Sequence, residues 1–390
     1  MHHEAWISER LSDLSKSHLD RHVQVYPEAG GKIRMGDRTY LNFSSNDYLN
    51  LARHPDVVAK AAGALRVAGC GATASRLLTG TLAWHDELEQ KLARYKGHPC
   101  ALLFGSGFLA NVGTIPALMG KNDHVFADKL VHASILDAVT LSRAKLYRFR
   151  HNDVEHLEQL LKKSATSGRK LIVTESVFSM DGDIAPLQHI ANVAQRHGAM
   201  VMVDEAHATG VFGPKGSGLV REWGLEPLIN IALGTLSKAF GGYGGFVACS
   251  KPVRAFLINH ARSFIYSTAL APSVVAAALG ALQVIEGSGE LGTQLLNNAA
   301  AFRNRLEEGG LNTGNSASQI IPVMVGENSK TLAISSKLRE QGIIGVAIRP
   351  PTVPQGTARI RLSVTLAHTR EDLERVAQVI IATAQGEGLL

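Results

Sequence analysis

Residues 199–207 read AMVMVDEAH and residues 229–238 read INIALGTLSK. Each begins with a short apolar run that lacks a helical period, so we predict two buried strands of a parallel sheet. Asp204 follows the first run, and Lys238 stands in a turn just after the second. Since ligands of open α/β sheets bind at the carboxyl ends of the strands, this edge is the predicted ligand site.

Both side chains also have ordinary interpretations. A strand-end Asp is commonly a helix cap or a solvated carboxylate, and a Lys after a turn is commonly a surface cation. Their combination on two such strands favours a functional role. The glycines after Lys238 support that role, because they leave room beside the amine for a bulky planar ligand: Gly241, Gly242, Gly244 and Gly245.

Two known patterns overlap this stretch. Asp204–His207 spells DEAH, as in nucleic-acid helicases, but that motif needs a phosphate loop. The candidate loop, Gly113–Lys121, has the wrong spacing and precedes Asn122 instead of Ser or Thr. Thr235–Lys238 fits a loose S/T-x-x-K acylase pattern, whose Ser-Asp-Asn and Lys-Thr-Gly companions the sequence lacks.

The composition limits the class of protein. A chain of 390 residues exceeds the size of one growing core, so we expect two domains. The net charge of +6 is not gathered into a basic run, which argues against a nucleic-acid partner. Cys70, Cys100 and Cys249 lie far apart, so we expect neither disulfides nor a metal site. No apolar run approaches the ~20 residues of a membrane span and the N-terminus lacks a secretory h-region, so we expect no membrane contact and a cytoplasmic location.

Strand and helix patterns alternate through the middle of the chain. His132 and Ser179 fall just beyond predicted strand ends, so the topology directs them toward the edge that carries Asp204 and Lys238. Repeated βαβ units predict an α/β fold with a mostly parallel sheet and helices on both faces. The predicted strands are Cys100–Phe104, Asp123–Asp128, Leu146–Phe149, Leu171–Thr174, Ala199–Val203, Ile229–Leu233 and Phe246–Cys249.

The glycine-rich turn Gly105–Asn111 joins a predicted strand to a helix. Free backbone N–H groups and the helix dipole make such a turn an anion site. The turn also matches a relaxed dinucleotide fingerprint, with Asp128 at a suitable distance to hold a ribose. Ala110 at the third glycine position and the late place of the turn in the chain count against it. A nicotinamide oxidoreductase therefore remains the alternative from another class of enzyme, and a non-catalytic binding protein is a third.

The sequence predicts three regions. Residues 1–45 are an N-terminal helix and arm, with an amphipathic helix over 4–22 in which Arg21 lies near the C-terminal end, where a cation suits the helix dipole. Residues 46–285 form the large ligand-binding domain. Residues 286–390 carry the alternating patterns of a small C-terminal α+β domain.

An anion site and a nearby amine suit one ligand, a phosphorylated aromatic aldehyde. Pyridoxal 5′-phosphate (PLP) fits each part. Lys238 would form the Schiff base, and Asp204 would face the pyridine nitrogen and favour its protonated form. The other predicted contacts are the phosphate with Ser106, Gly107, Phe108 and Thr235, the ring face with His132, and the phenolic oxygen with His207 and Ser179.

Four motifs together resemble the α-oxoamine synthase family of fold-type-I PLP enzymes, over essentially the full chain. They are Asn46–Leu49, Gly105–Asn111, Val203–His207 and Thr235–Ala239. Ser237 stands where such enzymes often have glycine. Arg21 and Ala347–Pro354 most resemble the members that join L-alanine to a pimeloyl thioester in biotin synthesis.

The resemblance implies a mechanism and a set of roles. Lys238 would remove the α-proton of L-alanine, the carbanion would attack the thioester, and carbon dioxide would leave. His132 would assist the ketone intermediate, and Arg21 and Thr352 would contact substrate. The family is dimeric with shared sites, so Ser267 and Thr268 would reach the partner subunit's phosphate. The resemblance leaves open coenzyme A or an acyl carrier protein as carrier, and sister activities that use glycine with acetyl or succinyl thioesters.

Overall fold

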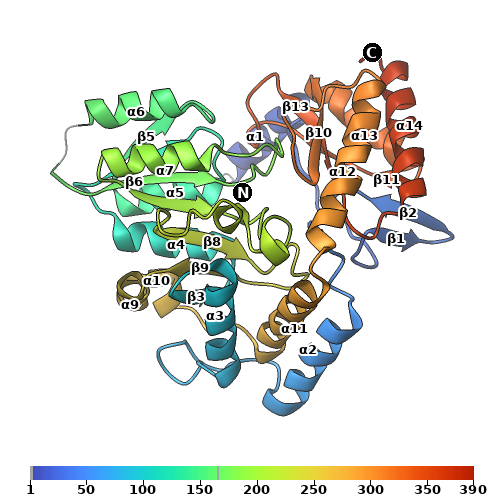
Figure 1. Cartoon of the computed structure of the whole chain (residues 1–390). Coiled ribbons are helices and arrows are strands. Elements are labelled where there is room, and N and C mark those ends of the chain that lie inside the picture. Colours follow the sequence, from blue (N-terminus) through green and yellow to red (C-terminus); the bar gives the residue numbers. More distant parts are fainter. Residues whose placement is uncertain (1–2, 165–166) are drawn as a thin grey trace. The chain divides into compact units, whose positions relative to one another are not determined.

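The computed structural model describes residues 3–164 and 167–390. The chain forms two compact units, which are coloured by sequence in Figure 1. The large unit comprises Asn46–Ser179 and Asp183–Leu295. The small unit comprises the N-terminal residues to Ser45, together with Met180–Gly182 and Leu296–Leu390. Both ends of the chain therefore contribute to the small unit.

The seven strands of the large unit form one sheet in the order β3-β9-β8-β7-β6-β4-β5 (Figure 1). Neighbours are parallel except around β9, which runs antiparallel to β3 and β8. The predicted mostly parallel sheet is thus confirmed. Its strands are β3 (Cys100–Phe104), β4 (His124–Asp128), β5 (Lys145–Phe149), β6 (Lys170–Glu175), β7 (Met200–Asp204), β8 (Ile231–Thr235) and β9 (Gly245–Cys249).

Helices cover both faces of this sheet. Apolar side chains of α4, α5, α9 and α10 pack with alternate strand residues such as Leu102, Met202 and Leu233 into one core cluster. Figure 1 shows α7 and α6 on the side opposite to α4. The helices are α2 (Pro55–Ala68), α3 (Ala83–Lys96), α4 (Gly107–Leu118), α5 (Ala133–Ser142), α6 (Val154–Lys163), α7 (Leu187–Arg196), α8 (Leu219–Glu222), α9 (Lys251–His260), α10 (Arg262–Ile265) and α11 (Pro272–Ser288), with one 3₁₀ turn at Pro214–Gly216.

Strand β8 begins two residues later than the sequence predicts. Asn230 does not join the strand, because its side-chain oxygen accepts the backbone N–H of Val201 at 2.8 Å and its own N–H bonds the Val201 carbonyl at 3.0 Å. At its other end the strand runs on to Thr235, its last residue, which pairs with Gly245 of β9. This pairing places Thr235 at the carboxyl edge of the sheet.

The small unit contains two three-stranded sheets. In one, β1 and β2 form an antiparallel pair and the short β11 adds in parallel to β2. In the other, β13 lies between β10 and β12 and is antiparallel to both. The elements are α1 (Ala5–Lys16), β1 (Lys32–Met35), β2 (Arg38–Asn42), β10 (Ile320–Gly326), α13 (Asn328–Glu340), β11 (Ile343–Ile344), β12 (Val346–Ile348), β13 (Ala358–Ser363) and α14 (Arg370–Gly386), while α12 (Leu291–Glu308) spans both units.

Two N-terminal features differ from the sequence-based expectation. The helix expected over residues 4–22 ends at Lys16, and His18 adopts a left-handed backbone with φ of 55°. No residue of α1 is buried, so packing does not extend the helix further. The arm expected to residue 45 contains the β1–β2 hairpin, whose tight turn uses the positive φ of Gly36.

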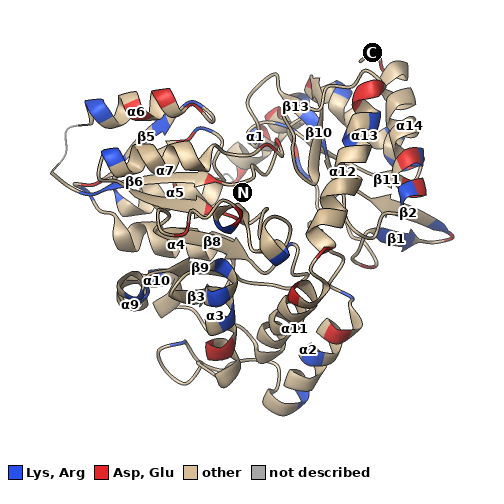
Figure 2. Cartoon of the chain, viewed as in Figure 1, with Lys and Arg blue, Asp and Glu red and all other residues tan. Residues whose placement is uncertain are grey.

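Charged side chains of both signs alternate along the outer helices. Figure 2 shows blue and red residues intermixed on α2, α3 and α14. Asp204, the last residue of β7, is the single charged residue in the strands β7 and β8. Opposite charges at close spacing cancel at a distance, so these helices do not form a field of one sign.

Two further findings apply to the described residues alone. No single helix there is long and apolar enough to cross a bilayer. Taken together, α11 and α12 have the length and composition of a membrane span, but the pair is bent by 78° at the junction. No group of three or more His, Cys, Asp or Glu side chains that could hold a metal ion occurs in residues 3–164 and 167–390.

We expect the small unit to lose stability in acid because of His368. The ring is buried and stacks on Phe43, with ring centroids 4.1 Å apart. Burial lowers the pKa of His368 to about 4, whereas an unfolded His titrates near ~6.5. Because the folded pKa is depressed, the unfolded chain binds the proton first as pH falls. The stabilisation is therefore complete above about pH 6.5 and is lost progressively toward about pH 4.

We expect His368→Gln to weaken the fall in unfolding free energy between about pH 6.5 and about pH 4, by up to roughly 3 kcal/mol at the acid end. Urea denaturation of the variant and the parent across this range measures the difference, so that carboxylates shared by both proteins cancel. Parallel pH curves for the two proteins would contradict the assignment.

Candidate active site

Four neighbouring parallel strands end at one edge of the sheet. Asp128, Glu175, Asp204 and Thr235 are the last residues of β4, β6, β7 and β8. Glu175 and Asp204 are paired in register across β6 and β7. Parallel strands bring their carboxyl ends to the same edge, so the loops after these residues converge there.

The loops at this edge carry the residues singled out from the sequence. His132 follows β4 as the N-cap of α5, Ser179 follows β6, and Lys238 follows β8. Lys238 and Asp204 both act electrostatically on His132. The structure therefore brings Asp204, His132 and Lys238 within the range of charge interaction.

Asp204 is a buried carboxylate with two fixed donors. Its Oδ1 accepts the Ala206 N–H at 2.9 Å, and its Oδ2 accepts the Asn111 amide at 3.1 Å. The side chain is only 6% exposed. Each oxygen keeps a lone pair for one more donor, so the carboxylate can still accept an N–H from a bound ring.

A chain of hydrogen bonds runs from Asp204 to His132. Asn111 also donates to the Ser134 hydroxyl at 2.9 Å, and that hydroxyl lies 2.8 Å from His132 Nδ1. The Ser134 N–H donates to the same Nδ1 at 3.3 Å. Nδ1 is therefore an acceptor, and the neutral ring carries its proton on Nε2, where it can be donated to a ligand.

The surroundings of His132 favour the neutral form of its ring. Although solvent reaches the ring, loss of hydration lowers the pKa of His132. The charge of Asp204 opposes this change and that of Lys238 adds to it. At neutral pH, His132 is thus a hydrogen-bond donor through Nε2 that carries no charge.

Lys238 lies in a tight turn between β8 and β9. Its carbonyl accepts the Gly241 N–H at 2.8 Å, and Leu236 exchanges bonds with Gly242 and Gly244 across the turn at 2.9 and 3.0 Å. Gly241 has φ of +64°, and a Cβ there would come within 2.3 Å of the Ala52 backbone nitrogen. The turn therefore requires glycine at this position and holds the lysine backbone firmly.

His207 and Ser179 complete the predicted ring contacts. His207 is buried, and its Nδ1 lies 2.7 Å from the Tyr48 hydroxyl, which also donates to Asn46 Oδ1 at 3.3 Å. Ser179 is also buried. Tyr48 fixes the orientation of His207, a function that the sequence analysis did not assign to it.

Glu175 is the buried acid that the sequence analysis missed. Its Oε1 accepts the His132 N–H at 2.5 Å, and the Ser179 backbone also donates to its carboxyl group. Burial raises the pKa of Glu175 well above its usual range, and the Asp204 charge raises it further. Glu175 thus joins the segments that carry His132 and Ser179.

The glycine-rich turn lies beside the end of β8. Ser106 caps α4 by accepting the Leu109 N–H at 3.1 Å, and Gly107 begins the helix. The first N–H groups of a helix have no acceptor within it, so those of Gly107 and Phe108 can serve an anion. A Cβ on Gly107 would lie 2.6 Å from the Thr235 methyl carbon, so glycine alone permits this close approach.

Ser267 and Thr268 lie apart from these contacts, between α10 and α11. Thr268 forms a bridge with Ser75. Together with Arg76 and Ser263, both residues line a small cavity of about 20 Å³.

Arg21 and Thr352 belong to the small unit, where they contact each other. The Arg21 guanidinium donates to the Thr352 hydroxyl at 3.2 Å across 331 residues of sequence. Arg349 holds the same N-terminal segment by donating to the carbonyls of His18 and Asp20, the latter at 3.0 Å. The two residues expected to contact substrate are therefore neighbours.

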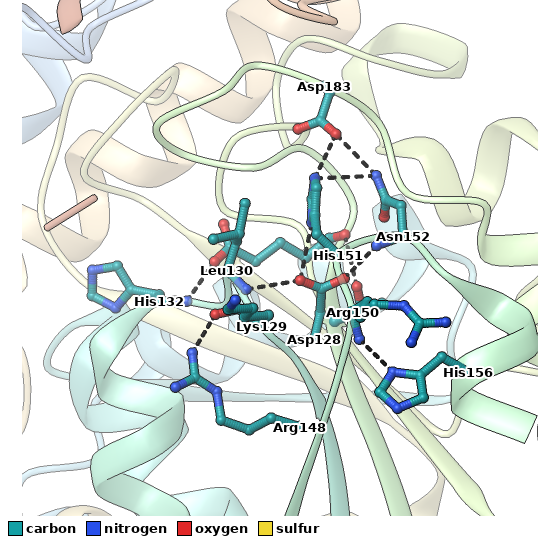
Figure 3. Close-up of polar contacts among 12 residues, drawn as sticks. Asp128, Lys129, Leu130, His132, Arg148, Arg150, His151, Asn152, His156 and Asp183 are labelled. Carbon is teal, nitrogen blue, oxygen red and sulfur yellow. Dashed lines mark hydrogen bonds and ion pairs between the residues drawn. The ribbon is translucent and has the colours of Figure 1, made fainter. Parts of the chain in front are cut away.

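The dinucleotide interpretation is wrong, because Asp128 cannot hold a ribose. Its side chain is fully buried, and its oxygens accept from Leu130 N at 2.8 Å, Asn152 N at 2.8 Å and the His151 ring at 3.0 Å (Figure 3). A carboxylate with these internal partners is not available to a ligand hydroxyl.

Comparison with known proteins agrees with this geometry. The family model described as aminotransferase class I and II matches residues 38–380. An 8-amino-7-oxononanoate synthase of Geobacter sulfurreducens is 43% identical over 387 residues, covering 98% of this chain and 99% of that protein. A putative 8-amino-7-oxononanoate synthase of Paramagnetospirillum magneticum is 46% identical over 363 residues, covering 92% of each.

Solved structures give the same result. A serine palmitoyltransferase from S. paucimobilis with a bound PLP–myriocin aldimine has a TM-score of 0.93 and 33% identity, covering 99% of this chain and 98% of that one. An 8-amino-7-oxononanoate synthase from Francisella tularensis has a TM-score of 0.77 and 29% identity, covering 90% of this chain and 99% of that one. The chain therefore belongs to the aminotransferase class I and II family, and its fold is that of the fold-type-I PLP transferases.

Proposed function

We propose that this chain catalyses the decarboxylative condensation of L-alanine with a pimeloyl thioester, which yields 8-amino-7-oxononanoate, carbon dioxide and the free thiol carrier in biotin biosynthesis. The carrying observation is that Asp204 is the last residue of β7 and that Lys238 follows the end of the adjacent strand β8. The proposal draws its substrates from the relatives named for this activity, which cover more than nine tenths of the chain.

The residues at the sheet edge fit PLP as cofactor. A side chain at position 107 would collide with Thr235, so the first turn of α4 carries no side chain at Gly107, and its N–H groups suit a phosphate. Asp204 would face the pyridine nitrogen, and His132 would stack on the ring. The remaining proposed contacts are His207 and Ser179 at the phenolic oxygen, Ser106, Gly107, Phe108 and Thr235 at the phosphate, and Lys238 as the covalent attachment.

PLP, when bound, withdraws electrons from the α-carbon of an attached amino acid. Lys238 would supply the amine that takes the proton from that carbon and later returns one. His132 would donate its Nε2 proton to the developing oxygen of the ketone, as its tautomer allows. The negative charge of Asp204 would stabilise the protonated, positively charged ring nitrogen.

A pimeloyl chain carries a second carboxylate, which the Arg21 guanidinium is suited to bind. We therefore expect Arg21→Gln to raise KM for the pimeloyl thioester about tenfold, as for loss of one charged hydrogen bond, without changing KM for L-alanine. Steady-state kinetics with each substrate varied in turn measure both constants.

Arg10 of α1 is an exposed arginine that supplies the matched control. Its replacement by Gln should leave both KM values as in the parent. An unchanged KM for the thioester in Arg21→Gln, or an equal rise for L-alanine, would remove Arg21 from the acyl site.

The function is tested by assaying the purified protein with PLP. L-alanine with pimeloyl-CoA or a pimeloyl carrier protein should give carbon dioxide and free thiol, and the two donors together identify the carrier. Glycine with acetyl-CoA or succinyl-CoA represents the sister activities, glycine C-acetyltransferase and 5-aminolevulinate synthase. A strict preference for glycine would contradict the proposal.

We further propose a cytoplasmic homodimer in which Ser267 and Thr268 reach the phosphate of the partner subunit. Thr268 is exposed, and Tyr266 beside it is 71% exposed, as expected of a loop that meets another surface. Sedimentation equilibrium tests the dimer, and a monomeric, fully active enzyme would contradict it.

A further inference from the structure

The loop after β5 carries a histidine that bridges two buried carboxylates. His151 Nδ1 lies 3.0 Å from Asp128 Oδ1, and His151 Nε2 lies 2.8 Å from Asp183 Oδ2 (Figure 3). Ionised carboxylate oxygens only accept hydrogen bonds, so both ring nitrogens donate to them. The Asn152 amide nitrogen is farther from Nε2, at 3.4 Å, and donates to Asp183 Oδ2 at 2.9 Å. A histidine that donates from both nitrogens is an imidazolium.

The surroundings favour this charged form. Burial alone would lower the pKa of His151, but its hydrogen bonds to Asp128 and Asp183 and the attraction of their charges raise it to about 10. Asp128 is fully buried and Asp183 is 7% exposed. A cation between two such anions stays protonated at neutral pH.

On one side His151 holds the segment that carries Ser179. The Asp183 carbonyl accepts the Phe178 N–H at 3.0 Å, and Val177 pairs with Ile184 in a short antiparallel bridge. The His151 ring packs edge-on against the Phe178 ring, with centroids 4.4 Å apart. His151 therefore contacts both strands of this short bridge, the one with Phe178 through ring packing and the one with Asp183 through a hydrogen bond. Ser179 directly follows Phe178.

On the other side His151 holds the segment that carries His132. Asp128, besides its bond to His151, accepts the Leu130 N–H at 2.8 Å, two residues before His132. Asn152 strengthens the same bridge, since its N–H donates to Asp128 at 2.8 Å and its side chain donates to Asp183 at 2.9 Å. The loop after β5 thus links Asp128, at the end of β4, to Asp183 in the segment that follows β6.

We propose that His151 is a positioning residue for the reaction, because by joining Asp128 to Asp183 it fixes the separation of His132 and Ser179. Glu175 ties the same two residues from the strand side, so each loop is held at two points. This inference rests on the proposed PLP function for the roles of His132 and Ser179, and on contacts within the large unit for the bridge itself.

The bridge is tested first without the cofactor. In the protein labelled with ¹⁵N-histidine, NMR should show both ring nitrogens of His151 protonated up to about pH 9, as its raised pKa requires. The signal is assigned by its loss in His151→Gln. A ring with one unprotonated nitrogen at about pH 7 would overturn the proposal.

Positioning is tested by α-proton exchange of the amino acid without acyl donor, expressed per bound PLP. We expect His151→Gln to bind PLP as the parent does but to exchange the α-proton of the amino acid about tenfold more slowly. In the full reaction kcat should fall while KM changes little. The double variant His151→Gln with Asp183→Asn should show the same slow exchange while leaving one fewer buried charge unpaired, so it remains informative if the single variant folds poorly.

The matched control is His156→Gln. His156 lies in α6 of the same region and accepts the Arg150 N–H at 2.9 Å, so its replacement should leave exchange unchanged (Figure 3). Exchange at the parent rate per bound PLP in either His151 variant would overturn the proposal. If the parent exchanges glycine but not L-alanine, the proposed substrate is wrong, and the comparison is made with glycine.

Discussion

Lys238→Ala is expected to remove nearly all turnover while the protein stays folded. The side chain has two proposed tasks, since its amine attaches the cofactor and also moves the α-proton. Loss of a positioned base alone costs about 10²- to 10⁴-fold in rate. We therefore expect turnover to fall by at least about a thousandfold.

The same variant should lose the visible absorbance band of lysine-bound PLP. Absorbance spectra before and after addition of PLP measure the band, and borohydride reduction followed by peptide mass spectrometry locates the attachment. Circular dichroism checks that the variant is folded. Since Lys238 lies in a turn fixed by Gly241 through backbone bonds, removal of its side chain leaves that turn intact.

Lys251→Ala supplies the control for this experiment. Lys251 is exposed at the start of α9, so its loss should change neither the spectrum nor the rate. A borohydride adduct on a peptide other than the one that contains Lys238, or full turnover in Lys238→Ala, would disprove the attachment site.

The parallel sheet was predictable because most of its strands are buried on both faces. Strands such as β7 and β8 consist of continuous apolar residues between polar loops, and this local pattern identifies them without any knowledge of the partners. The exact start of β8 was not predictable, because it depends on Asn230 bonding to Val201 on the neighbouring strand.

The β1–β2 hairpin could not be recognised from local pattern in the same way. Both strands are short and each has a single buried residue, so they lack the sustained buried alternation that indicates a strand. Their sheet is completed by β11, whose residues lie some three hundred positions later in the chain. Pairing at such sequence separation is decided by tertiary contacts and not by composition.

The strand-end rule located His132, Ser179 and Asp204, since each follows a predicted parallel strand. Applied to β6, the same rule indicates Glu175, which is the last residue of that strand. Asn111 and Ser134 carry no such signal. They lie within α4 and α5, and their role arises only because those helices pack on one face of the sheet.

Asp204→Asn is expected to separate cofactor binding from chemistry. The substitution keeps the shape of the side chain and an oxygen for the Ala206 N–H, and the phosphate turn is unchanged. The variant should therefore still bind PLP. It loses the negative charge that makes a protonated ring nitrogen favourable, and the ring then withdraws electrons from the α-carbon less strongly.

We expect α-proton exchange of L-alanine to fall about a hundredfold in Asp204→Asn, the usual scale for one lost electrostatic contact in a buried site. Proton NMR in deuterated water measures the exchange, again per bound PLP. Undiminished exchange would refute the proposed role of Asp204 in withdrawing electrons through the ring.

Asp137→Asn is the matched control, because Asp137 and Asp204 both raise the pKa of His132 by their charge. Asp137 is exposed on α5, so its loss should leave exchange close to that of the parent. If the two variants lose activity equally, the effect of Asp204 is a general charge effect on His132. If Asp204→Asn alone is slow, the carboxylate acts at its own position, next to Asn111 and at the end of β7, where the ring nitrogen is proposed to lie.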